Sequence, residues 1–136
     1  MSVLLIGIDT NILVRFLVKD DLRDYELATS FFSQLHDPDC VLVNPIVVAE
    51  LGWVLRRGYH YSAAEVRRML QSVLSASVFA LPASLRLDNN EAWFHTTHDD
   101  MADVMIAAIN AENGCERTWT FDRKAARNVP GMELLQ

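Results

Sequence analysis

The feature that most constrains the fold is a continuous apolar run near the start of the chain. Residues Leu4–Ile8 follow one another without a polar side chain and lead directly to Asp9. Apolar residues on successive positions are typical of a strand buried on both faces, as in a parallel sheet covered by helices. Asp9 then stands at the carboxyl end of that strand, where open α/β sheets bind ligands. Asp9 or Thr10 is equally suited to cap a helix predicted over Ile12–Val18, and the sequence alone leaves both roles open.

Strands and helices alternate along the rest of the chain, which indicates a parallel sheet between two helical layers. Asn44 precedes a proline, as at a helix start, and Ser62 and Glu65 have the spacing of a capping box. Further strands are predicted over Cys40–Val43, Val78–Leu81, Arg117–Phe121 and Met132–Leu135, and further helices over Asp21–Leu35 and Ile46–Arg57, from Ser62 to about Ala76, from Ser84 toward His98, over Met101–Glu112, and from Arg123 onward.

Composition limits the possible classes of protein. With 136 residues, 51% of them hydrophobic, the chain predicts a single domain over residues 1–136 with a substantial core. It has no apolar run of membrane-spanning length and no secretory signal pattern, so we expect a cytoplasmic protein without a membrane partner. Cys40 and Cys115 have no metal-ligand spacing. The net charge of −6 argues against a protein that coats nucleic acid nonspecifically, but it is compatible with an acidic metal site.

Three further acidic residues stand in settings like that of Asp9. Glu50 lies within an almost wholly apolar helix, Asp103 precedes an apolar helical stretch, and Asp122 ends a predicted strand. We expect Glu50 to project from a largely buried face, and a buried carboxylate needs a compensating partner such as a cation. Helix capping for Asp103 and a strand-to-turn role for Asp122 are the ordinary alternatives. Four such positions together favour a shared site.

These residues resemble the pattern of the PIN-domain family over essentially the whole chain. The resemblance rests on Asp9-Thr10-Asn11, on Glu50 in its apolar helix, on Ala102-Asp103 before Ile106-Ala107-Ala108, and on Thr120-Phe121-Asp122. The compact chain is most similar to the VapC-type toxins of toxin–antitoxin pairs. The resemblance implies a three-layer α/β/α sandwich with a mainly parallel central sheet, and an endoribonuclease that depends on Mg²⁺ or Mn²⁺. It also implies a homodimer and an antitoxin partner that blocks the site.

The expected chemistry assigns roles to these residues. Hard divalent cations prefer oxygen ligands, so we expect Asp9 and Asp103 to bind the first metal ion directly. Glu50 and Asp122 complete the pocket through water or a second metal ion. Hydrogen bonds from residues around a metal site orient its ligands. Three polar neighbours of the acids are suited to this role, although helix capping and strand packing explain them equally well. These neighbours are Thr10, Asn11 and Thr120.

Other functions fit the sequence less well. A catalytically silent PIN-like module that only binds proteins is the main alternative, but it leaves the four acids unexplained. His95 and His98 lack the spacing of a zinc site. Asn11 occupies the place of the second acid in a phosphoaspartyl hydrolase motif. Arg15, on an otherwise apolar helix, either pairs with an acid or lies at an interface.

Basic residues near the last strands offer a weaker signal. Arg123, Lys124 and Arg127 follow Asp122 closely, where they are suited to hold phosphate groups of an RNA substrate. A solvated helix face is the slightly favoured explanation.

Overall fold

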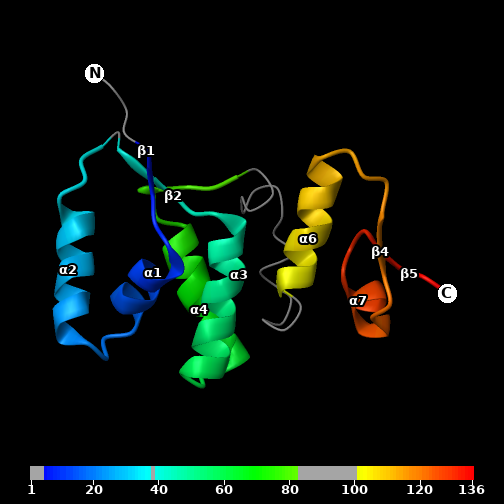
Figure 1. Ribbon diagram of the computed structural model, residues 1–136, viewed down its shortest axis with the longest axis horizontal. Coiled ribbons are helices and arrows are strands. Elements are labelled where there is room, and N and C mark those ends of the chain that lie inside the picture. The colour runs from blue at the N-terminus through cyan, green and yellow to red at the C-terminus, as the bar shows by residue number, and fades with distance from the viewer. Residues whose placement is uncertain (1–4, 38, 83–100) are drawn as a thin grey trace. The chain divides into compact units, whose positions relative to one another are not determined.

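The computed structural model describes residues 5–37, 39–82 and 101–136. The chain forms two compact units, Met1–Leu81 and Pro82–Gln136, and each is described by itself (Figure 1). The helix predicted from Ser84 toward His98 lies outside the described residues, as do His95 and His98. None of the helices in the described ranges is long and apolar enough to span a membrane.

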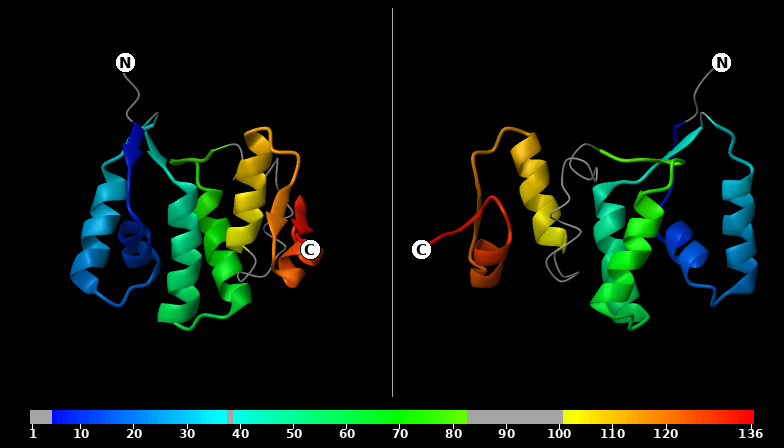
Figure 2. Two further views of the ribbon diagram at one scale, coloured as in Figure 1. Left: turned by 45° about the vertical axis from the view of Figure 1, so that its right-hand side comes forward. Right: turned by 180° about the vertical axis from the view of Figure 1, so that it is seen from behind.

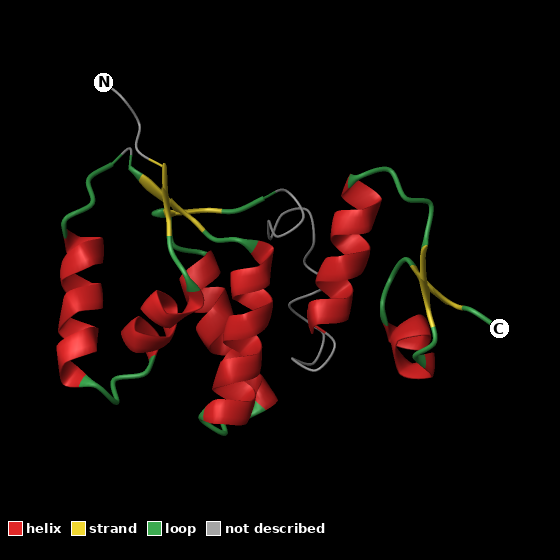
Figure 3. Ribbon diagram, in the orientation of Figure 1, coloured by secondary structure: helices red, strands yellow, loops and turns green. Residues whose placement is uncertain are grey.

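The first unit is built on a three-stranded parallel sheet. The elements of this unit are β1 (Leu5–Gly7), α1 (Thr10–Leu17), α2 (Leu22–Ser33), β2 (Cys40–Leu42), α3 (Pro45–Trp53), η1 (Val54–Gly58), α4 (Ala63–Leu74) and β3 (Phe79–Ala80). The strands lie in the order β1-β2-β3 (Figure 3). Leu5 pairs with Cys40 across β1 and β2, and Val41 pairs with Phe79 across β2 and β3. In both views of Figure 2, α1 lies between α2 and α3.

Local sequence signals begin these helices where they are predicted. Asn44 caps α3 by accepting a hydrogen bond from the backbone N–H of Ile46 at 2.8 Å, and Pro45 takes the first helical position. Ser62 and Glu65 form the capping box of α4. The end of the third helix differs from the prediction, because α3 gives way at Val54 to a π-helical turn, η1. The hydrophobic pattern of the sequence does not distinguish a π-helical turn from an α-helical one, so it did not indicate this change.

The core of the first unit lies between the sheet and the helices. Its fully buried large side chains are Leu13, Leu51, Leu55, Leu70, Val41, Val43, Val48 and Val66. Strand β1 departs from the expectation of burial on both faces, since Leu5 is 62% exposed and Gly7 is also exposed. The residues of this unit cover only the face of β1 that carries Ile6 and Ile8, which are both half-buried.

The second unit contains a two-stranded parallel sheet and two helices. Its elements are α6 (Met101–Glu112), β4 (Thr118–Thr120), α7 (Arg123–Asn128) and β5 (Met132–Leu134). Thr118 pairs with Met132 across the two strands. Helix α6 has the predicted bounds. Gly114 follows its end with a φ of +91°, a backbone conformation that glycine adopts readily because it has no Cβ.

Candidate functional site

Asp9 lies two residues after the end of β1 and caps α1. Its Oδ1 accepts a hydrogen bond from the backbone N–H of Asn11 at 3.1 Å, and the side chain is exposed. Its Oδ2 has no hydrogen-bond partner among the described residues. Asp9 therefore has the capping role that the sequence left open, and this role uses one of its two carboxylate oxygens.

Glu50 meets the first turn of α1 through Thr10. The hydroxyl of Thr10 donates a hydrogen bond to Oε1 of Glu50. Thr10 is 6% exposed and is the only buried polar residue in the described part of the chain. Because Thr10 is the next residue after Asp9, this bond places the Glu50 carboxylate beside the helix start that Asp9 caps.

The expectation that Glu50 projects from a buried face is wrong for this unit. Glu50 is exposed, and its neighbours on the same face of α3 are exposed too, Ile46 by 73% and Trp53 by 62%. Helix α3 buries Val47, Val48 and Leu51 instead. A helix that is apolar all round carries no periodic signal for which face is covered, so the sequence did not distinguish these faces.

Asp122 repeats the position of Asp9 in the second unit. It follows β4 and caps α7, and its Oδ1 accepts hydrogen bonds from the backbone N–H groups of Lys124 at 2.9 Å and Ala125 at 3.0 Å. Thr120 accepts a hydrogen bond from the backbone N–H of Asp122 at 3.0 Å. Thr120 thus holds the backbone of Asp122 and does not bind its carboxylate.

Asp103 lies in the first turn of α6 and is half-buried. A carboxylate in the first turn of a helix interacts favourably with the positive end of the helix dipole. Farther along α6, the side-chain amide of Asn110 donates a hydrogen bond to the Thr118 hydroxyl at 3.0 Å. This bond attaches α6 to β4, the strand that leads to Asp122.

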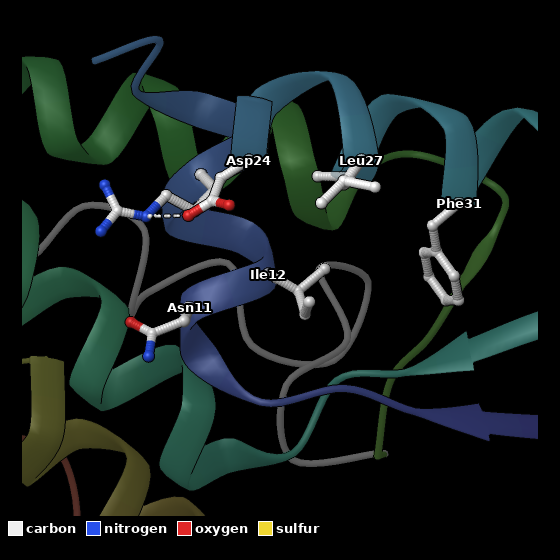
Figure 4. A pocket seen from close by; sticks show the side chains of 7 residues that line it. Asn11, Ile12, Asp24, Leu27 and Phe31 are labelled. Atoms are coloured by element: carbon white, nitrogen blue, oxygen red, sulfur yellow. Dashed lines mark ion pairs between the residues drawn. The ribbon is translucent and has the colours of Figure 1, made fainter. Parts of the chain in front are cut away.

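Asp9 borders a hollow on the surface of the first unit. This hollow has a volume of about 460 Å³ and is lined by Gly7, Ile8, Asp9, Ile12 and Phe31. A second hollow of about 370 Å³ shares Ile12 and Phe31 and extends along α1 and α2 as far as Arg15 and Asp24. Figure 4 shows Ile12, Leu27 and Phe31 around this second hollow. The Asp9 carboxylate is therefore reached along a mostly apolar surface.

The four acids divide equally between the two units. Asp9 and Glu50 belong to the first, and Asp103 and Asp122 to the second. Within the described residues of either unit taken alone, no three His, Cys, Asp or Glu side chains gather in a group suited to hold a metal ion. The described residues of each unit, taken alone, therefore do not form a complete metal centre of the usual kind.

Arg15 pairs with acids, which was one of the two roles open to it. Its Nη1 lies 3.1 Å from Oδ1 of Asp20, and its Nε lies 3.5 Å from Oδ2 of Asp24. Asp20 also accepts a hydrogen bond from the Tyr59 hydroxyl at 2.9 Å. The sequence carried no signal for Tyr59, because 39 residues separate it from Asp20.

Comparison with known proteins identifies the family. The PIN-domain family model matches residues 6–130, a range that spans both units and all four acids. No curated protein matches the chain. The α/β fold with mainly parallel strands agrees with this match. The chain therefore belongs to the PIN-domain family, whose members are generally nucleases that use divalent metal ions.

Proposed function

We propose that this protein is a metal-dependent endoribonuclease that hydrolyses phosphodiester bonds of RNA. The observation that carries the proposal is the hydrogen bond between Thr10 and Glu50 beside Asp9, because it brings two acids of the family pattern to one helix start. Asp9, Glu50, Asp103 and Asp122 are the proposed catalytic and metal-binding residues. The match to a family of nucleases supports the same reaction class.

The donor atoms of Asp9 and Glu50 fit a hard divalent cation such as Mg²⁺ or Mn²⁺. Both residues offer carboxylate oxygens, the ligands such ions prefer. Oδ2 of Asp9 and Oε2 of Glu50 have no partner among the described residues, and both side chains are exposed. Asp9 and Asp103 would hold the ion directly, with Glu50 and Asp122 completing the site. A divalent ion bound there would stabilise the negative charge that develops on the scissile phosphate.

The chain's own residues prepare the carboxylates for this task. The backbone N–H of Asn11 fixes one oxygen of Asp9, and the Thr10 hydroxyl fixes one oxygen of Glu50. Ligands held in place by neighbouring hydrogen bonds need little rearrangement when they bind. The expected products are a 5′-phosphate and a 3′-hydroxyl.

We further propose that the protein is the homodimeric toxin of a toxin–antitoxin pair and that its antitoxin blocks the site. The similarity to VapC-type toxins supports this role. Light scattering of the purified protein tests the dimer. Co-expression with the product of an adjacent gene, followed by a cleavage assay of the complex, tests the inhibition.

Cleavage of end-labelled RNAs tests the nuclease. Structured and unstructured RNAs are incubated with the protein and Mn²⁺ or Mg²⁺, with and without EDTA. Asp9→Asn is compared with Asp21→Asn, since Asp21 caps α2 by accepting a hydrogen bond from the backbone N–H of Asp24 at 3.0 Å. Asparagine caps helices as well as aspartate does, so both variants keep their caps. We expect site-specific cuts that are lost with EDTA and in Asp9→Asn, and kept in Asp21→Asn.

A folded protein that cuts no RNA and gains no thermal stability from Mn²⁺ would contradict the proposal. A ligand that binds the folded state raises its melting temperature, so the second measurement does not depend on finding the right RNA. That double result would favour the silent protein-binding module.

A further inference from the structure

Helix α1 is attached to the α3–η1 segment at two separate points. The first is the hydrogen bond from Thr10 to Glu50. The second lies just beyond the other end of α1, where the Tyr59 hydroxyl donates to Oδ2 of Asp20 at 2.9 Å. Tyr59 directly follows η1 and caps it. Nothing in the proposed chemistry uses this second contact.

Arg15 connects the second contact to α1 itself. Its guanidinium lies 3.1 Å from Oδ1 of Asp20, so the two oxygens of one carboxylate bind a residue of α1 and the residue after η1. Arg15 also lies 3.5 Å from Asp24 of α2. The chain Arg15–Asp20–Tyr59 therefore joins the C-terminal half of α1 to the end of the α3–η1 segment.

The π-helical turn directs Tyr59 toward Asp20. The backbone N–H of Tyr59 bonds to the carbonyl of Val54 at 3.2 Å, five residues earlier. A π turn holds more residues than an α-helical turn, so it changes the direction in which later side chains leave the axis. Such turns are rare and occur frequently at functional sites.

Two attachment points restrict the position of α1 on the α3–η1 segment more tightly than one point would. Between them, α1 packs on α3, and Leu13, Leu51 and Leu55 are fully buried. Apolar packing is non-directional, so it allows small shifts of one helix along or around another. Two polar contacts with defined geometry remove that freedom.

We propose that Tyr59 and Asp20, together with Arg15, are positioning residues for Glu50. By holding α1 on the α3–η1 segment, these residues maintain the hydrogen bond from Thr10 to Glu50. They thereby maintain the position of Asp9, the residue before Thr10, near Glu50. The consequence for catalysis rests on the proposed function, whereas the mechanical coupling between the two attachments does not.

The protonation states of Tyr59 and Asp20 at neutral pH are those that their hydrogen bond requires. The Tyr59 hydroxyl, as the main cause, lowers the pKa of Asp20, and Arg15 contributes in the same direction. Burial and the bond to Asp20 raise the pKa of Tyr59. At neutral pH Tyr59 is therefore a protonated donor and Asp20 an ionised acceptor.

Tyr59→Phe tests the inference, with Tyr61→Phe as the matched control. Tyr61 lies next to Tyr59, with ring centroids 6.4 Å apart, and its hydroxyl has no hydrogen-bond partner among the described residues. Loss of a residue that orients a ligand weakens metal binding 10–100-fold, and Tyr59 acts through two further contacts. We expect Tyr59→Phe to raise the half-saturating Mn²⁺ concentration in a thermal-shift titration about three- to tenfold. Tyr61→Phe should leave it unchanged.

The decisive readout is a double-mutant cycle with Thr10→Val. In Thr10→Val the hydrogen bond to Glu50, which Tyr59 is proposed to maintain, is already absent. Tyr59→Phe should therefore cause no further change in the half-saturating Mn²⁺ concentration. The free energy of unfolding in urea is measured for the same four proteins, and we expect the two changes to be non-additive. Additive effects in unfolding would overturn the inference, even if the protein proves to bind no metal ion. Failure of the proposed function instead appears as a wild type that neither cleaves RNA nor responds to Mn²⁺, while the unfolding cycle still decides the coupling.

Discussion

The two strand-to-helix junctions that carry Asp9 and Asp122 share a capping aspartate but differ in the hydrogen bonds around it. Both aspartates follow a parallel strand and cap the next helix. Asp122 binds two backbone N–H groups through one oxygen, whereas Asp9 binds one. The Asp9 junction is also bonded to a second acid, since Thr10 binds Glu50. A capping carboxylate is thus available in both places, and at the first junction the described residues also include a hydrogen bond to a second acid of the set.

The helices that follow the two junctions differ in how they are held. Helix α1 buries Leu13 completely, while α7 buries only the small side chain of Ala125. The position of α1 therefore depends on core packing, and that of α7 depends more on its cap.

The largest effect is expected in the core beneath Asp9. Leu13→Ala leaves a cavity where a side chain was 0% exposed, and we expect a loss of about 2–5 kcal/mol of unfolding free energy. Ala125→Gly in α7 removes one methyl group and some helix propensity, for about 1 kcal/mol. Urea unfolding of both variants measures the difference. Equal losses would mean that the two helices are held alike.

The second prediction compares the two threonines beside the acids. Thr10→Val removes the hydrogen bond that orients Glu50 with little change in volume, so we expect RNA cleavage to fall about 10–100-fold. Thr120→Val removes an acceptor for the Asp122 backbone and should reduce cleavage less, because the Asp122 carboxylate keeps both of its N–H donors. Initial rates at saturating Mn²⁺ test this order, and a larger effect at Thr120 would reverse the contrast between the junctions.

The third prediction concerns the caps themselves. Asp122→Ala should cost about 1 kcal/mol of unfolding free energy, since it leaves the N–H groups of Lys124 and Ala125 without their acceptor. Asp9→Ala should cost less, because one N–H loses its partner. Thermal or urea unfolding of the alanine and asparagine variants separates capping from charge, as asparagine restores the cap at either position.

The smallest effect is a dependence on pH. The folded-state pKa of Asp20 is lowered, so its contribution to stability is present above the ordinary value of 3.8 and is lost as the pH falls through the folded pKa. The folded-state pKa of Tyr59 is raised, so its contribution is present below 10.0 and is lost as the pH rises through the folded pKa. The stability difference between wild type and Tyr59→Phe should therefore be widest between these values and narrow beyond both.

Urea unfolding from acid to alkaline pH measures that window, with Tyr61→Phe as control. The charged and titratable groups around the pair are Arg15, Asp24 and Tyr61. A difference that stays constant below pH 3.8 would show that Asp20 does not titrate through this contact.

Local sequence was sufficient for much of the fold. The caps at Asn44 and Ser62, the stop at Gly114 and the bounds of α6 depend on groups within about four residues of one another, so the chain carries their signal directly. The parallel direction of the strands followed from their alternation with helices. The order and spacing of Asp9, Glu50, Asp103 and Asp122 indicated the PIN-domain family, and the family match spans all four positions.

What the tertiary structure alone decided concerns partners that are distant in sequence. Thr10 reaches Glu50 across 40 residues and Tyr59 reaches Asp20 across 39, and no periodicity links residues so far apart. The exposed face of α3 and the π turn after it were hidden for a related reason: a segment that is apolar on every side fits several windings and orientations equally well. The sequence by itself therefore determined which residues begin the helices, and the shared site of the four acids stays its prediction, whereas packing determined which distant side chains contact these helices.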